Sequence, residues 1–132
     1  MTIEWTQMLP PETVQALAAA ERRAAIKARR DRAIAAGITL GGIGFATDDV
    51  SQQRIMGAAL AALIDPTYSV AWKTAGGFVT LDAATILAAA QAVRAHVQAC
   101  FDHEAQLLAA LEAGGPADPE TGWPGASVAD QG

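Results

Sequence analysis

The chain has 132 residues, 52% of them hydrophobic but only 5% aromatic, and a formal net charge of −5. This length suits one domain with a real hydrophobic core. The acidic charge argues against general nucleic-acid binding, because neutralising phosphates requires basic residues. No stretch of about 18 uncharged apolar residues occurs and the N-terminus lacks a secretory-signal pattern, so we expect no membrane span or leader. The single cysteine, Cys100, excludes an internal disulfide and is typical of a reducing compartment.

The first predicted element is a long helix. Residues 1–11 form a short N-terminal lead-in that ends in two prolines, and proline is well tolerated in the first turn of a helix. Every residue from 12 to 36 is a fair helix former, and Gly37 follows where glycine often ends a helix. A helix this long usually packs along a partner for most of its length.

Two β-hairpins are predicted next, one on each side of a short helix. The first spans residues 38–45 around Gly41-Gly42, because paired glycines supply the positive φ angles of a type I′ turn. The second spans residues 69–81 around Gly76-Gly77, with apolar residues alternating as in a half-buried pair of strands. Each hairpin is therefore expected to be antiparallel.

The short helix between the hairpins is predicted over residues 50–64. Thr47, Asp48 and Asp49 offer N-caps, and Asp49 with Gln52 resembles a capping box. An Asp-Pro pair ends the helix. Its larger apolar residues fall on or near one face: Val50, Met56, Leu60, Leu63 and Ile64.

The third predicted helix begins after Asp82, its expected N-cap, and runs to about Glu112. Apolar residues recur every three or four positions, which is typical of side-by-side helix packing. Leu87, Phe101 and Leu108 widen this stripe, so we expect it to bury against a second subunit. The repeating positions are Ile86, Ala90, Val93, Val97, Cys100, Leu107 and Leu111.

These elements predict an α+β, mostly helical domain over residues 12–112. Two long antiparallel Ala-rich helices are expected to hold the short helix and the two small β-hairpins between them. Residues 113–132 are rich in Gly, Pro and Asp and are expected to form a flexible tail, in which Trp123 can anchor to a neighbour. We expect a homo-oligomer such as a trimer. The predicted interface consists of Ile86, Ala90, Val93, Val97, Phe101, Leu108 and Trp123.

Chemistry-bearing residues are few. His96, Cys100 and His103 share one face of the third helix, which fits either a soft-metal site or a core cysteine flanked by histidines. We favour the second interpretation because a closed zinc site needs a fourth ligand and usually a turn. The two histidines share one helix with no nucleophile at a suggestive spacing, so no Ser-His-Asp set is indicated. No GxGxxG motif precedes a helix. We therefore expect no enzyme activity, no metal and no cofactor.

Charge is concentrated in the first helix, which carries six of the nine basic residues between positions 22 and 32. A basic stripe of this kind can bind an acidic partner, but a solvated helix face is the more common explanation. We favour the solvated face; an acidic protein surface would suit the stripe better than DNA. Trp72-Lys73 is interpreted as strand packing.

Three sequence blocks carry a family resemblance: GITLGGIGFATDDVSQQRI, VAWKTAGGFVTLDAATI and AVRAHV. Their order, over about residues 22–111, resembles an uncharacterised domain family of tailed-phage and prophage proteins. An Ala-Gly-Gly turn replaces the more usual Asp-Asn or Asp-Gly. Members are typically encoded among tail, baseplate and tail-fibre genes, so the resemblance implies a tail context and no particular reaction.

Two functions follow as hypotheses. The favoured one is a structural subunit of a phage tail, baseplate or tail-fibre attachment, located in the virion and made in the host bacterial cytoplasm. Its partners would be itself and other phage tail proteins, with no nucleic acid and no membrane. The alternative is a tail-fibre assembly chaperone that is absent from the mature virion. If the third helix mediates association, Val93→Asp should give a monomer or insoluble protein.

Overall fold

The structure is a computed structural model that describes residues 10–125. It is an α+β fold in which the helices dominate. Among the described residues, no helix combines the length and hydropathy needed to cross a membrane. The elements follow in the order α2 (Pro11–Ile34), β1 (Ile38–Leu40), β2 (Ile43–Phe45), α3 (Asp49–Ile64), β3 (Ser69–Thr74), β4 (Gly77–Asp82) and α4 (Ala83–Glu112).

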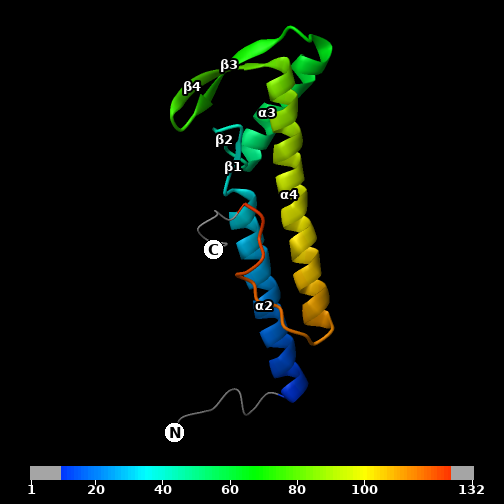
Figure 1. Cartoon of the computed structure of the whole chain (residues 1–132). Helices are drawn as coiled ribbons and strands as arrows, with labels where there is room; N and C mark the ends of the chain where they lie inside the picture. Colours follow the sequence, from blue (N-terminus) through cyan, green and yellow to red (C-terminus); the bar gives the residue numbers. More distant parts are fainter. Residues whose placement is uncertain (1–9, 126–132) are drawn as a thin grey trace.

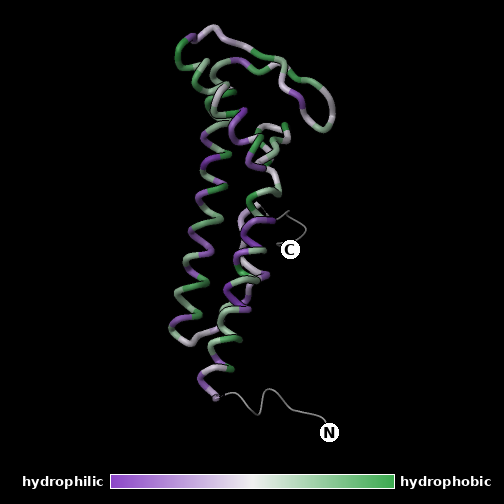
Figure 2. The backbone as a smooth tube through the Cα atoms, turned by 180° about the vertical axis from the view of Figure 1, so that it is seen from behind, coloured by the Kyte–Doolittle hydropathy of each residue, from purple (hydrophilic) through white to green (hydrophobic). Residues whose placement is uncertain are grey.

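The molecule is elongated, and α4 runs along most of its length (Figure 1). The first half of α4 packs against α3 and the hairpins, whereas α2 lies beside its second half. Hydrophobic and hydrophilic residues alternate along the whole of α4 (Figure 2). The two halves of α4 belong to two separate hydrophobic clusters, which are described below.

Both hairpins are antiparallel, and each forms its own two-stranded sheet. In the β1–β2 turn, Gly41 and Gly42 have φ angles of 58° and 80°, which confirms the predicted need for two positive values. In the second hairpin Thr74 pairs with Gly77, so the loop is 75–76, one residue earlier than predicted. Pairing Trp72 with Val79 keeps the apolar side chains on one face, and this packing sets the register.

The first cluster lies between α3, the hairpins and the first half of α4. Its fully buried large side chains include Ile55, Leu81, Ile86 and Val93, and Phe45 joins them from β2. The inner face of α3 is otherwise built from alanines. Small side chains on this face allow α3 and α4 to approach closely.

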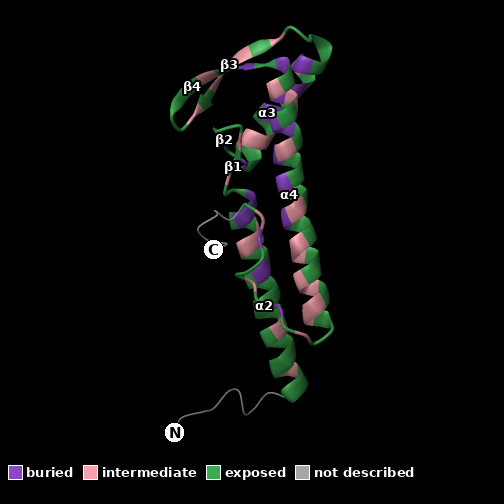
Figure 3. Cartoon of the chain, in the orientation of Figure 1, coloured by how far each residue is buried: buried purple, intermediate pink, exposed green. Residues whose placement is uncertain are grey.

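The second cluster joins α2, α4 and the segment after α4. It contains Ile26, Ala33 and Ile34 of α2 with Cys100 and Trp123. Earlier residues of α2 contribute nothing buried, and its first half is exposed (Figure 3). The expectation that α2 packs along most of its length is therefore wrong. No other element packs closely enough against residues 11–25 to bury any of their side chains.

The N-terminal cap of α4 forms as predicted, whereas the capping box predicted for α3 does not. Asp82 caps α4 as predicted, because its carboxylate accepts a hydrogen bond from the Thr85 backbone N–H at 2.8 Å. The predicted capping box at α3 does not form. Asp48, not Asp49, is the N-cap residue, and the Gln52 side chain donates instead to the backbone oxygen of Thr47 at 2.9 Å.

Thr47 joins the end of α2 to the start of α3. Its fully buried hydroxyl donates to the backbone oxygen of Ile34 at 2.6 Å and accepts from the Gly37 N–H at 2.8 Å. Both partners are main-chain groups at a helix end, which need hydrogen bonds when buried. One side chain thus fixes the position of the first hairpin relative to α2.

Candidate functional site

The interface predicted on α4 divides between the interior and the surface. Ile86, Ala90 and Val93 lie in the chain's own core, because α3 and the hairpins fold over them. Their assignment to an intermolecular surface is therefore corrected. Val93→Asp would place an unpaired carboxylate in the core and unfold the chain, so it does not test association.

The remaining α4 positions of that prediction lie at the edge of the second cluster or outside it. Val97 and Leu108 are half-buried against the second cluster. Phe101 is exposed, and the Arg30 guanidinium lies over its ring, 5.0 Å from the centroid. A groove of about 510 Å³ between α3 and α4 is lined by Met56, Val97, Phe101 and several polar residues. These residues offer a partly apolar surface.

The segment 113–125, called here the C-terminal strap, turns back and runs along α2 and α4 (Figure 1). Trp123 is only 5% exposed, and its Nε1–H donates to the backbone oxygen of Pro119 at 2.7 Å. Its ring meets His103 edge to face with a centroid distance of 4.5 Å, and Arg29 lies 5.8 Å from its centroid. The tryptophan expected to anchor in a neighbour is therefore held by its own chain. The rest of the predicted flexible tail, 126–132, lies outside the described residues.

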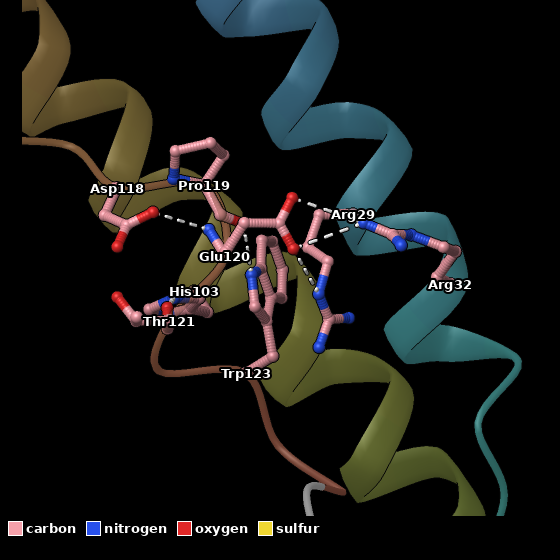
Figure 4. Close-up of polar contacts among 8 residues, drawn as sticks. All are labelled: Arg29, Arg32, His103, Asp118, Pro119, Glu120, Thr121 and Trp123. Carbon is pink, nitrogen blue, oxygen red and sulfur yellow. Dashed lines mark hydrogen bonds and ion pairs between the residues drawn. The ribbon is translucent and has the colours of Figure 1, made fainter. Parts of the chain in front are cut away.

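Glu120 and His103 fasten the strap on either side of the tryptophan (Figure 4). Glu120 pairs with Arg29 at 3.4 Å and with Arg32 at 3.3 Å. The Nε2 atom of His103 lies 2.7 Å from the backbone oxygen of Thr121, so that nitrogen is the donor. Part of the basic stripe of α2 thus contacts acidic groups of the same chain.

His96, Cys100 and His103 are not gathered around one point. The Nε2 atom of His96 donates to the backbone oxygen of Ala33 at 2.8 Å, whereas His103 faces the strap. Burial raises the pKa of the Cys100 thiol, which favours its neutral form. Over residues 10–125, no three His, Cys, Asp or Glu side chains are grouped as metal ligands.

The most prominent group of exposed apolar side chains lies on α3. Leu60, Leu63 and Ile64 are 61%, 68% and 77% exposed, and Val50 and Met56 are exposed on the same helix. We call these five residues the α3 outer face. No charged residue occurs between Arg54 and Asp65, so the C-terminal two thirds of α3 is uncharged. Contiguous exposed apolar surfaces on a small protein commonly mark interaction sites.

Sequence reasoning placed these five residues on or near one face but did not identify that face as the exposed one. The signal was present, because α3 has two apolar faces of different size. Ile55 and three alanines, at positions 58, 59 and 62, form the buried face. On α4 the buried residues of this cluster include two alanines, at positions 89 and 90, beside the larger Ile86 and Val93. Close packing of small residues leaves the larger side chains outside.

The comparisons with known proteins give a family and no function. A family model described as a domain of unknown function, DUF4376, matches residues 9–123. No curated protein and no solved structure matches the chain. The match includes the exposed first half of α2 and extends through the strap to Trp123, beyond the region of the sequence resemblance. Because it covers most of the chain, the protein belongs to the DUF4376 family.

Proposed function

We propose that this protein is a structural subunit of a bacteriophage tail that acts through protein–protein contacts. The observation that carries the proposal is the α3 outer face, where Leu60, Leu63 and Ile64 lie mostly in solvent. Exposed apolar area of this kind is stabilised when a partner removes it from water. A contact that buries it favours a lasting assembly over a transient encounter.

The polar groups of the chain support a binding role over catalysis. Arg30 is occupied by Glu104, and Glu120 by Arg29 and Arg32. These pairs join α2, α4 and the strap, so their role is to hold elements together. We propose further that α2 and α4 form an antiparallel Ala-rich frame that presents the α3 outer face at one end of the molecule.

The tail context comes from the sequence resemblance to tailed-phage and prophage proteins. In this proposal the protein resides in the virion, its partners are other tail proteins, and the α3 outer face contacts one of them. A tail-fibre assembly chaperone would use the same face during assembly and then leave. The two roles differ in whether the protein is present in the finished particle.

Quantitative mass spectrometry of purified virions, from a phage that carries this gene, tests the proposal. A fixed copy number in a small-integer ratio to a known tail protein supports a structural subunit. Absence from virions overturns that role; if deleting the gene also gives fibreless particles, the chaperone role takes its place. A phage with Leu60→Glu should lose the subunit from its particles. The matched control, Gln91→Glu, changes an exposed position on α4 and should keep it.

A further inference from the structure

The C-terminal strap is attached to α2 and α4 through side chains. The Glu120 carboxylate pairs with two arginines of α2, and His103 of α4 donates a hydrogen bond to the strap backbone. Trp123 is the anchor, since its side chain is buried in the second cluster. Over residues 10–125, no hydrogen bond joins the backbone of residues 116–125 to the backbone of a helix. The strap can therefore leave without breaking the main-chain hydrogen bonds of either helix.

The strap backbone lies close against α4 beside this tryptophan. Gly122 has a φ angle of 86°, and a Cβ atom there would lie 2.6 Å from Cε1 of His103. The imidazole also meets the Trp123 ring edge to face, so it cannot turn away without losing that contact. A larger residue is therefore excluded at this position. The features that the surface recognises are thus a carboxylate, a glycine and a tryptophan, spaced as in Glu120-x-Gly122-Trp123.

The surface beneath the strap is basic and apolar, which suits this ligand. Arg29 and Arg32 face the Glu120 carboxylate. Two acidic residues, Asp31 and Glu104, adjoin the site in sequence, but both pair with a third arginine of α2. The apolar part is the second cluster, which loses its cover when the tryptophan leaves. An uncovered apolar surface favours a ligand that restores this cover.

The tether between α4 and the strap is longer than its own site requires. His103 lies nine residues before Glu112, and Thr121, which it contacts, lies nine residues after. Nine residues of helix rise about 14 Å, whereas nine extended residues span up to about 30 Å. The tether begins with two glycines, which can adopt other backbone conformations at little cost. This slack allows the strap to reach the same surface on an adjacent copy.

We propose that the strap is an exchangeable arm, and that the α2–α4 surface beneath it is the docking site for the strap of a second copy. Exchange preserves each contact, because the second copy supplies the same glutamate, glycine and tryptophan. A chain's own strap competes at an effective concentration on the order of millimolar. Dilute copies therefore keep their own straps, whereas copies held side by side in an assembly exchange them. The setting in an assembly rests on the proposed function, whereas the docking site itself lies apart from the α3 outer face.

Binding of a free strap to an opened chain tests the docking site. The opened chain is the full-length variant that combines Glu120→Ala with Trp123→Ala, and the probe is a fluorescent peptide of residues 113–125. Fluorescence anisotropy should show saturable binding to the opened chain. Binding to the wild type should be at least tenfold weaker, because its own strap competes. No binding up to about a millimolar, the effective concentration of the tethered strap, overturns the site.

Matched controls separate recognition from nonspecific attraction. A peptide with Trp123→Ala or Gly122→Ala should not bind, because the first loses the anchor and the second meets the imidazole. In the opened chain Arg29→Ala should weaken binding at least severalfold, whereas Lys27→Ala, at an exposed basic position of the same helix, should leave it unchanged. Equal binding in these comparisons contradicts the proposed recognition. If circular dichroism shows that the double variant has lost its helices, Gly122→Ala in the full chain serves as the opened chain and decides the same question.

Mixing two incomplete chains tests the second copy as the occupant. Arg29→Glu with Arg32→Glu gives a donor whose own site repels its strap, and the opened chain is the acceptor. Sedimentation equilibrium should find a one-to-one pair in the mixture that neither chain forms alone. Peptide binding without pairing of the two chains overturns the second copy as occupant. These measurements use purified protein and a surface other than the α3 outer face, so their failure leaves the virion test of the proposed function independent.

Discussion

Arg30 of α2 donates hydrogen bonds from Nη1 to both carboxylate oxygens of Glu104 on α4, at distances of 2.8 and 2.9 Å. Both side chains are largely shielded, with exposed fractions of 16% and 14%. Arg30 also contacts Asp31 and lies over Phe101. The pKa of Arg30 is raised, first by its hydrogen bond to Glu104. Together with the hydrogen bond from His96 to the Ala33 backbone oxygen, this pair joins the two long helices.

Glu104→Gln should therefore destabilise the fold. The change removes the more buried of the two carboxylates that contact the Arg30 guanidinium, leaving only Asp31. Hydrogen bonds to charged groups contribute about 1.5–3 kcal/mol. Urea unfolding followed by circular dichroism measures the loss. Glu112→Gln, an exposed position at the end of α4, is the control and should change stability little. Equal stability of the two variants would show that the pair contributes nothing beyond a surface ion pair.

Thr47→Val should cost about 1–3 kcal/mol, because it leaves the buried backbone oxygen of Ile34 and the partly buried N–H of Gly37 without their partner. Valine has nearly the same shape, so the change tests the hydroxyl and not the packing. Thr47→Ser keeps the hydroxyl and should retain most of the stability. Thermal unfolding of the three proteins provides the measurement, and a Val variant as stable as the Ser variant would contradict this role.

Trp123→Ala should release the C-terminal strap from α2 and α4. Truncating a buried tryptophan costs about 3–5 kcal/mol, and here the loss falls mainly on attachment of the strap. Limited proteolysis should cut the variant within residues 113–125 much faster than the wild type. Trp123→Phe keeps an aromatic ring against His103 and should be intermediate. Unchanged proteolysis in the alanine variant would mean that the ion pairs of Glu120 suffice.

Asp82→Asn should alter how stability depends on pH. Hydrogen bonding from Thr85 holds the pKa of Asp82 below its ordinary value in the folded state. The stabilisation from this carboxylate is thus fully present above the unfolded pKa of about 4, and is lost as the pH falls through the lower folded pKa. The difference in unfolding midpoint between wild type and variant should be larger at pH 7 than at pH 2. A difference independent of pH would contradict the cap.

Local sequence signals determined the elements of this protein. The paired glycines, the cap at Asp82 and long runs of helix formers act over a few residues, so they fix helices and turns with little influence from the rest of the chain. The Ala75-Gly76 loop lies one residue earlier than expected, because side-chain packing sets the register of the hairpin. Asp48 is one of the three expected N-caps of α3, and local hydrogen bonds select it over Asp49 of the expected capping box.

Tertiary structure decided which apolar faces are inside. The sequence shows that the stripe on α4 and the large residues of α3 are both apolar faces, but it does not show which of the two the chain itself buries. In the structure the α4 stripe from Ile86 to Val93 lies in the chain's own core. Leu60, Leu63 and Ile64 point outward, because α3 presents Ile55 and three alanines to that core instead. It also holds Trp123 against α2 and α4, although the composition of the strap indicates flexibility. Periodicity shows that a face is apolar, but what covers that face depends on contacts between distant segments.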